Sequence, residues 1–209
     1  MACKRGKFIV FDGLDGCGKG SQLLRLHSYL FTKDKRNHVV ATRNPYNSEY
    51  YDEIRRILKE SSNPQENAEL LADLFVKDRK VHARLVEFFL QEGFHVGCDR
   101  YKYSTLTYQQ TQGIPLGRLV EMHKGVLVPD LAIILDVPAE VAMKRLAADE
   151  GREYKEVFEK LEFQEKLRSN FLALPDQLSG ENLVVINGNR SFDEVFKAIR
   201  VEVDKVLAA

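Results

Sequence analysis

The sequence lacks several features that would assign it to a specialised class of protein. Its 209 residues include no tryptophan, only six prolines and three cysteines, and no apolar run long enough to cross a membrane. The cysteines are odd in number and do not have the spacing of metal ligands, which predicts free thiols and a cytoplasmic location. Internal repeats and low-complexity tracts are also missing. What remains is the profile of a globular protein.

Neither sign of charge predominates. Lysine plus arginine and aspartate plus glutamate both number 31, so the formal net charge is zero. A protein dedicated to nucleic acid normally carries a basic excess, so we expect no nucleic-acid partner. The lack of a long apolar run predicts that the protein does not insert into a membrane. Hydrophobic residues make up 44% of the chain, enough for a core, and the length suits one domain over residues 1–209.

Five short apolar runs alternate with longer helical patterns. Nearly continuous apolar runs are typical of strands that are covered on both faces. The alternation predicts an α/β fold of three layers, a five-stranded parallel sheet flanked by helices, with ligands at the carboxyl ends of the strands. The expected strands are Phe8–Phe11, Val39–Thr42, His95–Cys98, Ala132–Leu135 and Leu183–Ile186; the expected helices are Lys19–Thr32, Ser48–Lys59, Asn67–Gln91, Lys102–Gln110, Ala139–Ala148, Glu156–Leu172 and Phe192–Leu207.

A glycine-rich stretch joins the first expected strand to an amphipathic helix. Gly13, Gly18 and Lys19 have the spacing of a phosphate-binding loop, or P-loop. In such a loop, backbone N–H groups and the helix N-terminus face the phosphates, and the lysine adds a mobile positive charge. The stretch therefore predicts a P-loop NTPase fold with ATP as ligand. The predicted ATP site comprises Gly13, Leu14, Asp15, Gly16, Cys17, Gly18, Lys19, Gly20 and Ser21.

Gly20 departs from the usual P-loop pattern. Many P-loops have serine or threonine at this position, and its hydroxyl ligates Mg²⁺. Ser21 supplies the next hydroxyl, one position further on. Because Mg²⁺ accepts several water ligands, carboxylates can hold it together with the phosphates. We predict that Asp15 and Asp99 do so, directly or through water, with Asp12 as a further candidate.

Four segments of the chain together resemble the thymidylate kinase family. They are "FDGLDGCGKGSQ" from Phe11, "LFVKDR" from Leu74, "DRYKYSTLTYQ" from Asp99 and "PDLAIILDVPAEVAMKRL" from Pro129. The P-loop is shared by many families, whereas the segment from Asp99 is much more specific. The resemblance implies a Mg²⁺-dependent homodimer that transfers the γ-phosphate of ATP to dTMP, giving dTDP.

Phe75 and Arg79 lie four residues apart, on one face of an expected helix. An aromatic ring beside a guanidinium group can stack on a base and donate a hydrogen bond to its carbonyl oxygen. The matching residues of the family act in this way on thymine. Phe75 also fits the apolar core stripe of its helix, and this alternative stays open.

The segment from Asp99 supplies most of the remaining acceptor contacts by resemblance. Arg100 matches the arginine that holds the acceptor phosphate, and Tyr108 matches a residue against the 2′ carbon, where its ring excludes a ribose hydroxyl. Thr105 and Gln109, four residues apart, match residues at the base edge. The predicted dTMP site comprises Asp15, Arg43, Phe75, Arg79, Arg100, Ser104, Thr105, Tyr108 and Gln109.

Two further segments carry expectations from the family. Asn44, after Arg43, replaces the glutamate that is common there, which removes one carboxylate near the metal. Residues 147–156 match a mobile lid over the active site. Because this P-loop contains no arginine, Arg152 of the lid is expected to balance the charge of the transferring group, while Arg145 assists it or stacks on adenine. The predicted catalytic residues are Lys19, Arg100, Arg152, Asp99 and Asp15.

Two alternatives to dTMP phosphorylation remain open. In the first, the acceptor is another nucleoside monophosphate, a pyrimidine nucleotide before AMP. "GKGSQ" is closer to a pattern of adenylate kinases than to the usual thymidylate kinase pattern, but acceptor choice is expected to lie in the Phe75–Arg79 and Thr105–Gln109 regions. Gly20 and Asn44 motivate the second, a P-loop nucleotide-binding regulator without catalysis.

Overall fold

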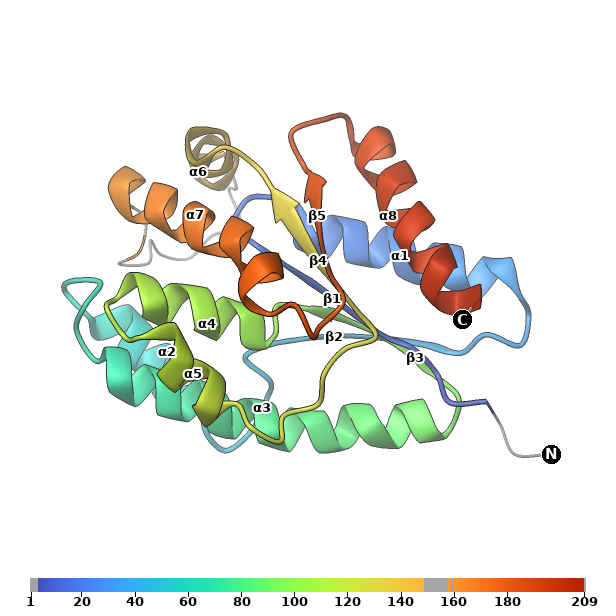
Figure 1. The fold of residues 1–209 in the computed structure, drawn as a ribbon, viewed down its shortest axis with the longest axis horizontal. Helices are drawn as coiled ribbons and strands as arrows, with labels where there is room; N and C mark the ends of the chain where they lie inside the picture. Colours follow the sequence, from blue (N-terminus) through green and yellow to red (C-terminus); the bar gives the residue numbers. More distant parts are fainter. Residues whose placement is uncertain (1–3, 149–157, 159, 209) are drawn as a thin grey trace.

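The computed structural model describes residues 4–148, 158 and 160–208. A five-stranded sheet in the order β2-β3-β1-β4-β5, with every pair parallel, lies between two layers of helices (Figure 1). This confirms the predicted α/β fold, and every strand lies within two residues of its expected bounds. The strands are β1 (Phe8–Gly13), β2 (Val39–Arg43), β3 (His95–Asp99), β4 (Leu131–Asp136) and β5 (Leu183–Asn187).

Helices cover both faces of the sheet. One face carries α1 (Lys19–Lys33) and α8 (Phe192–Ala208), and the other carries α3 (Ala68–Gln91), α4 (Lys102–Thr111) and α7 (Leu161–Gln177) (Figure 1). Three shorter helices complete the described fold: α2 (Tyr51–Glu60), α5 (Leu116–Met122) and α6 (Ala139–Ala147).

Three helix predictions differ from the structure. Helix α5 was not predicted, because its seven residues are too few to display a helical period. Helix α2 begins at Tyr51, since the backbone makes short turns over the preceding "PYNS". Helix α7 runs to Gln177, beyond the expected Leu172, and includes Pro175 in its last turn, where the helix is about to end.

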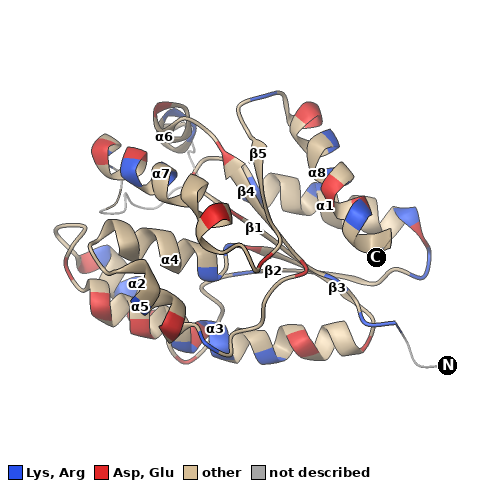
Figure 2. Ribbon diagram, viewed as in Figure 1, with Lys and Arg blue, Asp and Glu red and all other residues tan. Residues whose placement is uncertain are grey.

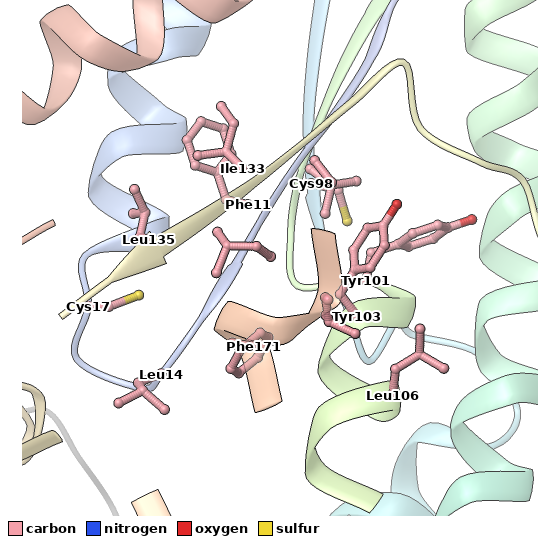
Figure 3. Packing of buried hydrophobic residues seen from close by; sticks show 14 of the residues in the cluster. Phe11, Leu14, Cys17, Cys98, Tyr101, Tyr103, Leu106, Ile133, Leu135 and Phe171 are labelled. Atoms are coloured by element: carbon pink, nitrogen blue, oxygen red, sulfur yellow. The ribbon is translucent and has the colours of Figure 1, made fainter. Parts of the chain in front are cut away.

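The central strands carry the core. All six residues of β1 are buried, as are five of the six in β4, whereas the edge strands β2 and β5 are more exposed. Figure 3 shows the centre of this core, where Phe11 and Ile133 of neighbouring strands lie together on one side of the sheet and Tyr101 and Phe171 lie on the other. Burial on both faces explains why the strands read as continuous apolar runs.

The strand order indicates which end of the sheet binds ligands. Strand β1 lies between β3 and β4, so the connections that leave β1 and β3 diverge to opposite faces of the sheet. Ligands of open α/β sheets bind at such a switch point, outside the carboxyl ends of the strands. Charges of both signs are spread along the outer helices, as on α3 and α8 (Figure 2). None of the described helices has the length and apolarity that crossing a membrane requires.

Candidate active site

The P-loop connects β1 directly to α1. Gly18 is the N-cap of α1 and has a φ of 97°, a left-handed conformation that glycine adopts without strain. A Cβ at Gly16 would overlap the carbonyl group of Ala142 on α6, so only glycine fits there. Leu14 and Cys17 belong to the core that holds Leu135 and Phe171 (Figure 3). Packing against the core and α6 therefore fixes the conformation of the loop. The N–H groups at the N-terminus of α1 are available to bind an anion.

Lys19 lies folded across this loop. Its Nζ donates to the carbonyl oxygens of Leu14 (2.8 Å) and Gly13 (3.1 Å) and lies 3.8 Å from Asp15 Oδ1. Cys17 beside it is buried, and burial raises the pKa of its thiol. The ammonium group of Lys19 therefore lies against the loop. Phosphate oxygens of a bound nucleotide can replace the loop carbonyls as its hydrogen-bond acceptors.

Asp99 faces the position of Gly20. A Cβ built on Gly20 would lie 3.4 Å from Asp99 Oδ2, so a side chain at position 20 would point toward this carboxylate. The other oxygen, Asp99 Oδ1, is buried and has no hydrogen-bond donor among the described residues. A buried acceptor without a donor fits a hydrated Mg²⁺. No group of three His, Cys, Asp or Glu side chains in the described ranges could hold a metal ion, and Mg²⁺ commonly needs only one or two carboxylates beside phosphates.

Arg100 stands at the end of β3 in a left-handed conformation with a φ of 65°. Its Nη2 bonds Asp15 Oδ1, its Nη1 lies 3.3 Å from Ser104 Oγ, and the guanidinium lies over the ring of Tyr108. The Tyr108 hydroxyl donates to Asp15 Oδ2 at 2.9 Å. Burial alone would raise the pKa of Asp15, but the charges of Arg100 and Lys19 hold that pKa well below its usual range. Asp15 is therefore ionised and committed to Arg100.

Asp12 supports Arg100 from beneath. It is fully buried, and its two carboxylate oxygens accept from the backbone N–H of Tyr101 (2.9 Å) and from the Ser104 hydroxyl. Burial raises its pKa to about 6, although the Ser104 hydrogen bond opposes that shift. Because Asp12 is fully buried and both of its oxygens accept hydrogen bonds, its suggested role as a metal ligand does not fit, whereas the Asp15 side chain is 30% exposed. Asp12 instead holds both ends of the turn that presents Arg100, and the only sequence signal was a carboxylate within a buried strand.

A cavity lined by twelve residues opens beside Arg100. Seven of the nine residues predicted to bind dTMP line it. Of the other two, Asp15 contacts the lining residues Arg100 and Tyr108, while Arg43 is exposed at the end of β2 and does not line the cavity. The lining residues are Asn44, Pro45, Arg55, Leu58, Phe75, Arg79, Arg100, Ser104, Thr105, Tyr108, Gln109 and Phe158.

The inner end of the cavity holds polar atoms without partners. Arg79 donates through Nη1 to the Phe75 carbonyl (3.1 Å), but its Nε makes no hydrogen bond within the described structure. Thr105 Oγ1 and Gln109 Oε1 are likewise unpaired, and both side chains are 1% exposed. Buried polar groups nearly always have partners, so three orphans at one cavity indicate that a polar ligand completes them. Phe75 is half-buried, packs against the core and also lines the cavity, so its contribution to the core is confirmed and its contact with a base stays a prediction.

Asn44 forms part of the cavity wall. Its Nδ2 donates to Asp78 Oδ2 (3.1 Å), and its Oδ1 lies 3.3 Å from His82 Nδ1. His82 Nε2 lies 2.9 Å from Thr42 Oγ1, and burial, together with the charge of Arg79, lowers the pKa of His82 to about 4. The neutral ring therefore joins Thr42 to Asn44. Asn44 replaces a carboxylate with an amide that belongs to a buried network.

Five lining residues were not among the predicted dTMP contacts: Asn44, Pro45, Arg55, Leu58 and Phe158. Arg55 stands on α2 next to the buried Ile54, and nothing in its local pattern separates it from a surface arginine. Phe158 had a usable signal, since it is an aromatic residue within a charged stretch. Its ring meets Tyr108 edge-on at 5.4 Å and stacks on Phe163 at 5.2 Å.

The remaining predicted residues lie away from this cavity or outside the described ranges. Ser21 is exposed on α1, and Arg145 is exposed on α6. Arg152 and residues 149–156 of the expected lid lie outside the described residues.

The fold and the site together define a class of protein. The sheet is parallel and carries a glycine loop with a lysine at its switch point, and a cavity lined by arginines lies next to this loop. This is the arrangement of a P-loop nucleoside monophosphate kinase. Within this class the chain belongs to the thymidylate kinase family, whose model, described as thymidylate kinase, matches residues 11–199.

Relatives agree over nearly the full length. A protein of Staphylothermus marinus, named as a probable thymidylate kinase, is 36% identical over 200 residues that cover 95% of each chain. A probable thymidylate kinase of Methanococcus maripaludis is 37% identical over 207 residues, 96% of each chain. The thymidylate kinase of Desulfotalea psychrophila is 33% identical over 208 residues, 99% of this chain and 98% of its own.

Proposed function

We propose that this protein transfers the γ-phosphate of ATP to dTMP, producing dTDP. The observation that carries the proposal is the set of unpaired polar atoms at the inner end of the cavity. Arg79 offers a donor and Gln109 offers an acceptor, and these two complement the carbonyl oxygen and adjacent N–H of thymine. Phe75 supplies an aromatic surface for the base, and Thr105 supplies a hydroxyl beside it.

Arg100, which lines the cavity and contacts Asp15 of the P-loop, is the proposed partner of the acceptor phosphate. Its Nη2 bonds Asp15 and its Nη1 lies near Ser104, and the acceptor phosphate is proposed to take the place of the Asp15 carboxylate on the guanidinium. Arg43, exposed one residue before Asn44, is proposed as an additional phosphate contact. Tyr108, whose hydroxyl is tied to Asp15, presents its ring for the sugar and favours a deoxyribose.

Catalysis is proposed to rest on positioning and charge. The attacking oxygen of dTMP is already anionic, so no general base is required. Lys19 and the P-loop hold the phosphates of ATP, and Arg152 of the proposed lid balances the charge on the transferring group, with Arg145 near the adenine. A bound Mg²⁺ neutralises charge on the phosphate oxygens. Asp99, with its unpaired Oδ1, fits that ion best, and Asp15 is the second proposed ligand.

The proposal includes assembly and location. A homodimer is implied by the family resemblance, and Leu70, Leu85 and Phe88 of α3 expose apolar side chains that a second copy could cover. Light scattering after gel filtration gives the oligomeric state. A cytoplasmic location stays a prediction from the free cysteines.

A coupled assay of ADP production tests the proposal with dTMP, dUMP, UMP, CMP and AMP as acceptors. We expect dTMP to be preferred, with dUMP next because it offers the same hydrogen-bonding edge. Turnover of AMP or CMP in preference to dTMP would establish a different nucleoside monophosphate kinase. Turnover of none at millimolar acceptor would leave the nucleotide-binding regulator as the function.

A further inference from the structure

A second glutamine stands behind the cavity, one helical turn from Gln109. Gln112 caps the carboxyl end of α4 and is buried, but it does not line the cavity. Its Nε2 donates to the carbonyl oxygen of Pro64, in the connection between α2 and α3. A backbone carbonyl can only accept, so the orientation of the Gln112 amide follows from chemistry: its nitrogen faces Pro64 and its oxygen faces the opposite way.

That oxygen orients Gln109 in turn. Gln109 Nε2 donates to Gln112 Oε1 at 2.8 Å. With its nitrogen committed, Gln109 has its Oε1 left as the atom for the cavity, and this is the buried oxygen without a partner. Rotating the Gln109 amide by half a turn would set two oxygens against each other and lose the hydrogen bond. The relay from Pro64 through Gln112 to Gln109 therefore has one consistent direction.

We infer that Gln112 is a specificity-determining residue, which acts through Gln109 without touching the base. The relay keeps an acceptor facing the nucleobase, so a base with an N–H at this position, thymine or uracil, is bound. Cytosine presents a bare ring nitrogen there, and two acceptors would face each other. This inference deepens the proposed function and depends on it, because it assigns how that same cavity distinguishes pyrimidines.

The test is the ratio of kcat/KM for dTMP to kcat/KM for dCMP in wild type and in Gln112→Leu. Leucine removes the acceptor, so the Gln109 amide can rotate and offer its N–H to cytosine. We expect the ratio to narrow about tenfold, the scale of one misdirected buried hydrogen bond, while the KM for ATP stays unchanged. Arg79 still faces the other base atom, so part of the preference for dTMP remains.

Gln110→Leu is the matched control. Gln110 is the same residue type on the same helix, also has a buried unpaired Oε1 and lies outside the cavity lining. It should leave the ratio at the wild-type value. Gln112→Glu, buried and protonated, should also keep the wild-type ratio, since its hydroxyl donates to the Pro64 carbonyl and its other oxygen accepts from Gln109 Nε2. If Gln112→Leu does not fold, Gln112→Met, which is unbranched and similar in length, replaces it.

The inference is overturned if wild type prefers dTMP over dCMP and the folded Gln112 variant retains the same preference. It is also overturned if Gln110→Leu narrows the ratio as much, because the effect would then be general to the helix. Failure of the proposed function has a different signature, in which wild type itself does not phosphorylate dTMP.

Discussion

The two ends of the cavity are built on opposite principles. At the phosphate end, where the cavity meets the P-loop, Arg100 is paired with Asp15, and Lys19 beside the cavity donates to the loop carbonyls. At the base end, Thr105 Oγ1 and Gln109 Oε1 are buried without any partner in the described structure. In the proposed binding mode, the substrate replaces existing partners at the first end and supplies missing partners at the second.

This difference separates binding strength from selectivity. A phosphate that displaces Asp15 from Arg100 exchanges one anion for another, so little is gained from geometry and every phosphorylated ligand benefits equally. An unpaired buried acceptor costs free energy until a matching donor arrives, and a mismatched base leaves that cost in place. The base end should therefore select the nucleotide, while the phosphate end performs the transfer.

The largest expected effect on kcat comes from removing the charge of Lys19 at the phosphate end. Lys19→Met keeps the apolar stem of the side chain and removes the charge that faces the phosphates of ATP. We expect kcat to fall by about 10³-fold, comparable to the loss of a key charge-stabilising group in other enzymes. The fold should survive, because the lysine ammonium contacts only residues of the loop itself, and a thermal unfolding curve measured beside the assay checks this. A rate near that of wild type would contradict the P-loop assignment.

As pH falls, protonation of His82, beside the base end, should lower the unfolding free energy before the pairing of Asp15 with Arg100 is lost. The pKa of His82 is lowered to about 4 in the folded protein, so the unfolded chain takes up the proton first as pH falls below about 6.5. The unfolding free energy is then lost as pH drops from about 6.5 toward 4, by up to about 3 kcal/mol for this group. Asp15, whose pKa is lowered, keeps its pairing with Arg100 until the pH is below the ordinary range of a carboxyl group.

Urea unfolding at pH 7 and pH 4.5 measures this difference. Wild type should lose more unfolding free energy between the two pH values than His82→Gln, which has no ring to protonate. Equal losses in the two proteins would show that His82 does not titrate as its burial demands.

Asp12→Asn tests the support beneath Arg100. Asp12 accepts two hydrogen bonds, and an asparagine offers only one oxygen, so one of the donors from Tyr101 or Ser104 meets an amide nitrogen. We expect about 2 kcal/mol less unfolding free energy and a ten- to hundredfold lower kcat/KM for dTMP, since Arg100 loses its fixed turn. Ser104→Ala should produce a similar defect, and the double variant should be little worse than either alone. Additive losses would mean that the two residues act separately.

The sequence predicted the sheet and the motif-bearing residues well, for identifiable reasons. Strands β1 and β4 are buried on both faces, so their apolar runs are unbroken, and the P-loop residues are adjacent in the chain. The seven-residue α5 gave no comparable signal.

Pairings across the chain were beyond such patterns. Asp12 meets Ser104, and Gln112 meets Pro64, only because the strand order and the packing of α4 bring these distant segments together. Arg55 likewise lines the cavity because of where α2 lies. A local sequence pattern can predict a phosphate-binding loop. It cannot predict long-range hydrogen bonds, which decide that an atom such as Gln109 Oε1 has no partner.

The smallest expected effect sharpens the comparison most directly. Thr105→Val removes an unpaired buried hydroxyl at almost constant shape, so the empty protein should gain about 1 kcal/mol of unfolding free energy while the KM for dTMP rises a fewfold. Thr111→Val on the same helix is the control, because the Thr111 hydroxyl donates to the Thr107 carbonyl (2.8 Å) and accepts from Asn170. That variant should lose about 1 kcal/mol and leave the KM unchanged. Two valine substitutions on one helix would then shift stability in opposite directions, which is what a site that awaits its ligand requires. If Thr105→Val destabilises the protein as much as Thr111→Val, the Thr105 hydroxyl is already satisfied and the base end is not the incomplete half of the cavity.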